Sequence, residues 1–169
     1  FSLLNKKIVT NAKEGDILEV CPPALYMMGD VANRLKSFGG AALIIDYGYT
    51  KPGAGDTIQA IKGHNYQSVL ENPGETDITA HINFMALQEA LAESEIDLHG
   101  PLTQGDFLKN LGIDYRAEQI IKTNGPDVTS KVQRSLKKLI DKKEMGELFK
   151  VLGVSYDLYG EPPGFHTIL

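Results

Sequence analysis

The sequence predicts an α/β fold built around a parallel sheet. The strongest observation is the run Ala41–Ile45, which is apolar without alternation and lies between Gly39-Gly40 and Asp46. Such a run is typical of an internal parallel strand covered on both faces by helices. Apolar residues at helical spacing flank it on both sides, and a second apolar run follows at 148–154.

In the N-terminal part, two short runs that favour β-structure, 2–9 and 16–20, predict two strands joined by a turn at 11–15. Pro22-Pro23 opens a helix, because proline fits the first helical turn. This helix ends at Phe38, before the glycine pair. Its apolar face is Leu25, Met28, Val31, Ala32 and Leu35.

The middle of the chain begins with an unusually long connection at 50–77, rich in glycine and polar residues. Connections of this length are typically lids, binding loops or disordered segments. Residues 78–82 are predicted to be extended, and Asn83 is predicted to cap a helix over 84–94. The predicted buried face of this helix is Phe84, Leu87, Ala90 and Leu91.

The C-terminal part is predicted to be mainly helical before it returns to a strand. Its elements, in order, are a strand at 96–98, a short helix capped by Thr103 and stopped by Gly112, a helix over 115–122, a helix over 128–140, a strand at 148–154 and an irregular tail at 156–169. We expect Asp127 or Thr129 to cap the helix over 128–140.

One face of this last helix and the residues after it are basic. The cations are Lys131, Arg134, Lys137, Lys138, Lys142 and Lys143. Such a face suits nucleic acid or an acidic partner, but a solvated helix face is the more common explanation. We therefore expect no nucleic acid partner.

Composition excludes several classes of protein. The 169 residues carry a net charge of −5 and one cysteine, Cys21, so an internal disulfide and a cysteine-based zinc site are excluded. No apolar run approaches the roughly 20 residues of a membrane-spanning helix. A single domain over 1–169 is predicted. The start, Phe1 without an initiator Met or secretory signal, indicates a processed chain or a fragment.

Strong local catalytic signatures are absent from the sequence: it contains no G-x-G-x-x-G, no G-x-x-x-x-G-K-[ST], no H-E-x-x-H and no G-x-S-x-G. Gly53-Ala54-Gly55 is only half of a glycine fingerprint and is interpreted as a flexible loop. His64 and His81 show no metal-ligand spacing, so no metal site is expected.

Two groups of residues are candidates for a site. Asp46 and Tyr47 follow the strand at 41–45, where ligands bind in open α/β sheets; alternatively, Asp46 only turns the chain. The acidic loop with Glu71, Glu75 and Asp77 offers carboxylates that match a guanidinium; alternatively, it is a solvent-facing turn.

Several separate motifs together resemble one family. They are Gly39–Gly48, Gly55–Ala60, Glu71–His81, Gln104-Gly105, Leu111–Ile113, Met145–Val151 and Pro162–Phe165. From about Asp16 to Phe165 the chain resembles the S-adenosylmethionine-dependent methyltransferase family that contains the mitochondrial complex I assembly arginine methyltransferase and its bacterial MidA-like relatives.

The resemblance implies the C-terminal part of a class I, Rossmann-like methyltransferase fold, with a mostly parallel sheet and helices on both faces. Ala41–Asp46 then corresponds to the fifth strand, and the residues that hold most of the S-adenosyl-L-methionine cofactor lie before Phe1. The implied activity is protein-arginine N-methylation linked to complex I assembly, in a bacterial cytoplasm or a mitochondrial matrix.

The resemblance also implies site residues. Glu75 and Asp77 shape the acceptor site, Asp46 and Tyr47 line the cleft, and His81 is a polar contact, while the catalytic residues stay unknown. The rival hypothesis is a noncatalytic interaction module that uses the loop at 50–77 and the basic face at 131–143.

Overall fold

A computed structural model describes residues 6–51, 53, 55–63 and 65–166. Its main sheet has the order β5-β1-β7-β6. The strands are β1 (Gly40–Tyr49), β5 (Ile82–Asn83), β6 (Asp97–Thr103) and β7 (Phe149–Tyr156). The helices are α1 (Lys6–Asn11), α2 (Pro22–Phe38), α3 (Phe84–Ala90), α4 (Gln104–Asn110), α5 (Ile113–Asn124), α6 (Thr129–Ile140) and α7 (Met145–Leu148).

The main sheet is mixed, so the expectation of a mostly parallel sheet is not met within the described residues. Strand β1 runs antiparallel to β7 over Gly40–Tyr47 and is parallel to β5 only at Gly48 and Tyr49. Strand β6 is also antiparallel to β7. No other described strand pairs with the second edge of β1 over Gly40–Tyr47.

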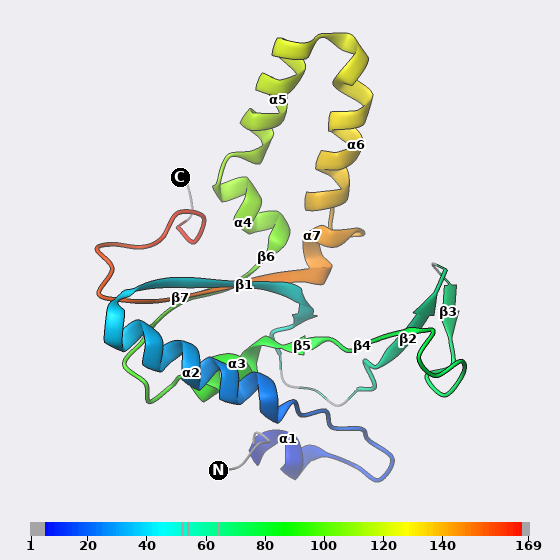
Figure 1. Cartoon of the computed structure of the whole chain (residues 1–169), viewed down its shortest axis with the longest axis vertical. Helices are drawn as coiled ribbons and strands as arrows, with labels where there is room; N and C mark the ends of the chain where they lie inside the picture. Colours follow the sequence, from blue (N-terminus) through cyan, green and yellow to red (C-terminus); the bar gives the residue numbers. More distant parts are fainter. Residues whose placement is uncertain (1–5, 52, 54, 64, 167–169) are drawn as a thin grey trace.

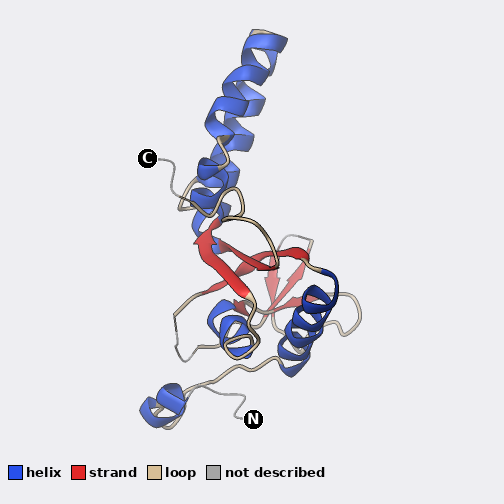
Figure 2. Ribbon diagram, turned by 90° about the vertical axis from the view of Figure 1, so that its left-hand side faces the viewer, coloured by secondary structure: helices blue, strands red, loops and turns tan. Residues whose placement is uncertain are grey.

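Helices α2 and α3 cover one face of this sheet, as Figures 1 and 2 show. Ala42 and Ile44 of β1 pack against the hydrophobic core on the side of α2 and α3. Leu43 and Ile45 point the other way and are 51% and 46% exposed. The prediction that 41–45 is covered on both faces is therefore wrong for the described chain, because the strand alternates between a packed and an open face.

The core beneath the sheet joins α2, α3 and β7. Its buried members are Met28, Ala32, Leu35, Phe84, Leu87, Leu91, Ile96, Leu152 and Val154. The buried faces predicted for α2 and α3 supply most of this set, which confirms both helices. Asn83 caps α3, since its side chain accepts a hydrogen bond from the Ala86 N–H at 3.1 Å.

The prediction of two strands near the N-terminus is wrong for the residues that the structure describes. Residues 6–9 belong to helix α1, and 16–20 have no regular structure; residues 2–5 lie outside the described residues. A helix forms its hydrogen bonds locally, whereas a strand requires a partner. Within the described chain no strand pairs with either segment.

The long connection at 50–77, expected to be a loop, contains regular structure. Strands β2 (Gln59–Lys62), β3 (Asn65–Gln67) and β4 (Asp77–Thr79) form a three-stranded antiparallel sheet in the order β3-β2-β4. Gly63, with φ of 55°, adopts the left-handed conformation that the tight turn after β2 requires. This sheet projects to one side of the main sheet (Figure 1).

The helices of the C-terminal part extend away from the sheet as a column topped by α5 and α6 (Figure 1). Thr103 caps α4 as predicted, with its hydroxyl accepting from the Asp106 N–H at 3.1 Å. The cap predicted at Asp127 or Thr129 is wrong: α6 follows a 3-10 turn (Pro126–Val128), and within the described chain no side chain caps it.

The six cations of the predicted basic face are exposed, which agrees with a solvated face; they are Lys131, Arg134, Lys137, Lys138, Lys142 and Lys143. Among the described residues, no helix combines the length and the apolar character that crossing a membrane requires.

Candidate functional site

A cavity of about 410 Å³ lies at the carboxyl end of β1. Its walls come from the segment before α2, from the loop after β1, and from β5 with α3. The lining residues are Leu18, Glu19, Val20, Cys21, Ala24, Leu25, Tyr49, Gly53, Ile58, Ala80, His81, Ile82, Asn83, Met85, Ala86, Leu87 and Glu89. This is the end of the strand at which a ligand crevice is expected from the sequence.

A network of hydrogen bonds fixes one carboxylate of the cavity. Glu19 Oε1 accepts from the Thr57 N–H at 2.9 Å, and Glu19 Oε2 accepts from the Thr57 hydroxyl at 2.5 Å. The same hydroxyl accepts from the His81 N–H at 3.0 Å. Three segments that are distant in the sequence are thereby held together around the cavity.

Tyr49 is the second fixed polar group of the cavity wall. Burial raises the pKa of its phenol, and the negative charge of Glu19 raises it further, while a hydrogen bond with the Asn83 side chain opposes both effects. The phenol therefore stays neutral at pH values where a free tyrosine begins to ionise.

The cavity lining carries a negative formal charge. Its described lining includes two carboxylates, Glu19 and Glu89, and neither lysine nor arginine. A partly enclosed space with this balance favours a cation, because low-dielectric walls strengthen the attraction. No group of three or more His, Cys, Asp or Glu within the described chain could hold a metal ion.

The structure brings two of the five predicted site residues, His81 and Tyr47, together. His81 lines the cavity, and its ring lies 5.6 Å from that of Tyr47 in an edge contact. The Asp46 carboxylate accepts from the Tyr47 N–H at 2.8 Å. Neither Asp46 nor Tyr47 is part of the described lining.

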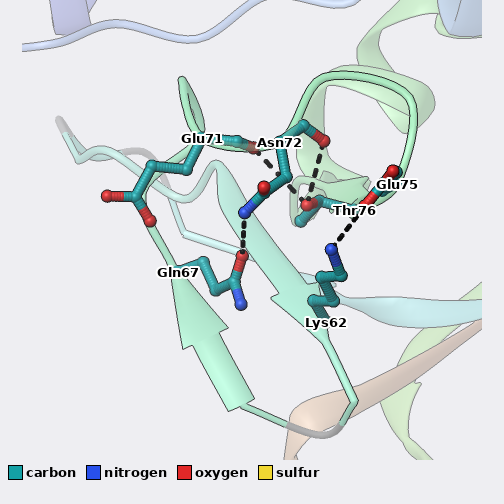
Figure 3. A network of polar contacts seen from close by, with 6 residues as sticks. All are labelled: Lys62, Gln67, Glu71, Asn72, Glu75 and Thr76. Carbon is teal, nitrogen blue, oxygen red and sulfur yellow. Dashed lines mark hydrogen bonds and ion pairs between the residues drawn. The ribbon is translucent and has the colours of Figure 1, made fainter.

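The remaining two predicted residues lie at the small sheet: Glu75 beside Lys62 of β2 (Figure 3), and Asp77 in β4. Glu75 forms an ion pair with Lys62 at 2.6 Å, with 69% of its side chain exposed. Asp77 is exposed at the start of β4. The carboxylates of this loop are thus separated from the cavity lining, although β4 leads directly to His81.

Glu19 and Thr57 are candidate residues that sequence reasoning missed. They are 38 positions apart: Glu19 lies outside the resembling motifs, and Thr57 lies within one of them, Gly55–Ala60, but was given no role. For Glu19 the signal was its position before the proline pair that opens α2, and for Thr57 it was the motif within the long glycine-rich connection.

The raised pKa of Tyr49 predicts a titration that can be measured. In a difference titration of wild type against Tyr49→Phe, followed by phenolate absorbance, the Tyr49 midpoint should lie above the ordinary value of 10.0. Glu19→Gln should lower that midpoint, because it removes the nearby negative charge. A midpoint at or below the ordinary value would contradict the geometry.

The same pKa shift determines how Tyr49 affects the stability of the protein as the pH rises. Folding raises the pKa of Tyr49, so the folded state holds this proton more tightly than the unfolded state does. The resulting stabilisation is complete below pH 10.0, the unfolded value, and is lost as the pH rises through the folded pKa. Tyr49→Phe should remove this part of the alkaline destabilisation.

Comparison with known proteins finds a family model described as "Putative S-adenosyl-L-methionine-dependent methyltransferase", which matches residues 2–102. Curated relatives include proteins named protein arginine methyltransferase NDUFAF7, mitochondrial. The zebrafish (Danio rerio) relative is 40% identical over 81% of this chain and 32% of its own length. The human relative is 37% identical over 79% of this chain and 30% of its own length.

Two solved structures from Burkholderia thailandensis are similar to this chain. One, of an uncharacterized protein, has a TM-score of 0.77 and 30% identity. The match covers 90% of this chain and 43% of the solved chain. The other contains S-adenosyl-homocysteine and has a TM-score of 0.66 and 31% identity. Its match covers 84% of this chain and 37% of the solved chain. The chain therefore spans about a third of the length of the curated relatives.

Proposed function

The chain belongs to the S-adenosyl-L-methionine-dependent methyltransferase family whose model it matches, and on this premise we propose that it forms the acceptor side of a protein-arginine N-methyltransferase. The observation that carries the proposal is the negatively charged cavity at the carboxyl end of β1. The names of the curated relatives support arginine as the acceptor.

We further propose that residues 1–169 form the C-terminal portion of a larger class I methyltransferase domain. One edge of β1 over Gly40–Tyr47 is paired with no strand among the described residues, which supports this, since another strand can pair there. The exposed Leu43 and Ile45 offer an apolar surface beside that edge. The length of the curated relatives also supports it, because this chain covers only about a third of them.

The division of labour follows from the residues present. S-adenosyl-L-methionine, when bound, supplies a methyl group: a carbon–nitrogen bond to the acceptor forms while the carbon–sulfur bond breaks, its electron pair stays on sulfur, and the acceptor nitrogen releases a proton to water. This chain carries no glycine-rich fingerprint, so its own part is to orient the acceptor and stabilise its positive charge.

Within this proposal the candidate residues take separate positions. His81 contacts the acceptor in the cavity, Tyr47 packs against His81 from β1, and Asp46 accepts a hydrogen bond from the Tyr47 backbone. Glu75 and Asp77 contact an acceptor protein from the small sheet, further out. The mitochondrial names of the relatives favour a mitochondrial matrix location; a role in complex I assembly is the finer proposal, which the family resemblance suggests.

The test is methyl transfer by the complete protein that contains this chain. With methyl-labelled S-adenosyl-L-methionine and a pool of arginine-centred peptides, label should appear as methylarginine after hydrolysis. A lysine-centred pool is the control. Label confined to lysine, or S-adenosyl-homocysteine binding without transfer, would overturn the arginine assignment. Failure to bind the cofactor would favour the noncatalytic interaction module.

Glu75→Gln should depress methylation more than it depresses cofactor affinity. The structure adds a control, because Lys62→Met breaks the same ion pair and keeps the acid. If Glu75 acts on the acceptor, Glu75→Gln should lower turnover severalfold and Lys62→Met should not. Equal losses would assign the pair to the stability of the small sheet, and unchanged turnover in both would remove Glu75 from the site.

A further inference from the structure

We propose that Glu19 binds the positively charged guanidinium of the methyl acceptor and that Thr57 positions it for this role. The inference rests on the proposed function and names the acceptor-binding group within the cavity. Four observations support it: the hydrogen bonds to Glu19, the negative charge of the cavity lining, the apolar side chains in its walls, and the fact that two other predicted carboxylates bind partners outside the cavity.

Both oxygens of the Glu19 carboxylate are oriented by one residue. The Thr57 N–H and hydroxyl donate to Oε1 and Oε2, at 2.9 and 2.5 Å. The hydroxyl also accepts from the His81 N–H at 3.0 Å, which directs its proton toward Glu19. A carboxylate has about four acceptor positions, so each oxygen keeps one for the paired N–H groups of a guanidinium.

The cavity around Glu19 suits an arginine side chain. Apolar residues such as Leu25, Ile58 and Met85 line it and can pack against a methylene stem. The described lining offers no lysine or arginine that could neutralise Glu19. The effect of its charge on Tyr49 agrees with a carboxylate that acts within the cavity.

Two of the predicted carboxylates are engaged elsewhere. Asp46 accepts from the backbone N–H of Tyr47, and Glu75 is paired with Lys62 at the small sheet. Neither is part of the described lining. Glu19 differs because it is half-buried, lies in the cavity wall and is fixed by the hydrogen bonds from Thr57. Among the described residues it forms no ion pair.

The first experiment separates acceptor binding from cofactor binding in the complete protein. Glu19→Gln keeps the size of the side chain and removes its charge, so KM for an arginine peptide should rise about tenfold or more. The dissociation constant of S-adenosyl-homocysteine should stay within about twofold of wild type. Glu14→Gln, exposed on the same segment, is the matched control and should change neither quantity.

Thr57 is tested as a positioning residue. Thr57→Val keeps the shape and the backbone N–H but removes the hydroxyl that donates to Glu19. It should raise KM for the arginine peptide with little change in kcat, and Thr57→Ser should restore the wild-type KM. Equal effects of Val and Ser, or a loss in kcat alone, would overturn the positioning role.

A binding measurement keeps this inference separate from the proposed function. Saturation-transfer NMR compares N-acetyl-arginine amide with N-acetyl-citrulline amide, in the presence of S-adenosyl-homocysteine. Wild type should prefer arginine, and Glu19→Gln should lose the preference even if the acceptor in turnover proves not to be arginine. A preserved preference in Glu19→Gln, or a loss confined to S-adenosyl-homocysteine binding, would overturn the inference.

Discussion

Replacing Gly48 by alanine should lower the free energy of unfolding by about 3 kcal/mol, at the upper end of the range for overpacking. A Cβ atom at this position would lie 2.2 Å from the Ile82 carbonyl oxygen and 2.9 Å from Phe84 Cε2. The first is backbone, so no side-chain rotation relieves it. Gly48 is needed for close approach: it is the residue at which β1 pairs in parallel with β5.

The same substitution should also reduce ligand binding. If β5 moves away to relieve the contact, the pairing of Tyr49 with Asn83 is lost, and the cavity wall that both residues form opens. Urea denaturation followed by circular dichroism measures the stability, and S-adenosyl-homocysteine affinity in the complete protein measures the site.

Gly29→Ala is the matched control with the opposite sign. Gly29 lies within α2, and a Cβ there would meet nothing within 4 Å. Alanine should therefore stabilise the helix by up to about 1 kcal/mol. If both glycine variants changed stability equally, close packing at Gly48 could not be the cause.

The elements that were predictable from sequence are those specified locally. The apolar spacing of α2 and the caps at Asn83 and Thr103 act within three or four residues, and the structure confirms them. The strand at 41–45 exists for the same reason, since its composition and its glycine boundary are local. Its partners are not local: β7 lies about a hundred residues away and runs antiparallel to it.

The same distinction explains the errors. Residues 16–20 have the composition of a strand but no described strand beside them, and the hairpin of β2 and β3 consists largely of polar residues that favour a loop. In the site, His81 was predicted as part of a motif. Glu19 was not, because its role depends on Thr57, which only the folded chain brings within hydrogen-bond distance.

Replacing Phe84 by alanine should produce the largest loss of stability, about 3 to 5 kcal/mol. Phe84 is 0% exposed and belongs to the core shared by α2, α3 and β7. Its removal forfeits the transfer energy of the ring and leaves a void. Phe38→Ala is the matched control: Phe38 is 79% exposed, and the substitution removes its ring contact with Arg34, so the loss should stay below about 1 kcal/mol.

The position of Phe84 gives the two variants different effects on function as well. It follows the Asn83 cap directly and begins the helix whose next three residues, Met85, Ala86 and Leu87, line the cavity. A void beneath this turn should loosen the cavity wall, so Phe84→Ala should weaken arginine binding even where the protein remains folded. Phe38→Ala, at the far end of α2, should not. Equal binding by both variants would show that the wall is held by β5 alone, and that the core beneath α3 supports the fold without shaping the site.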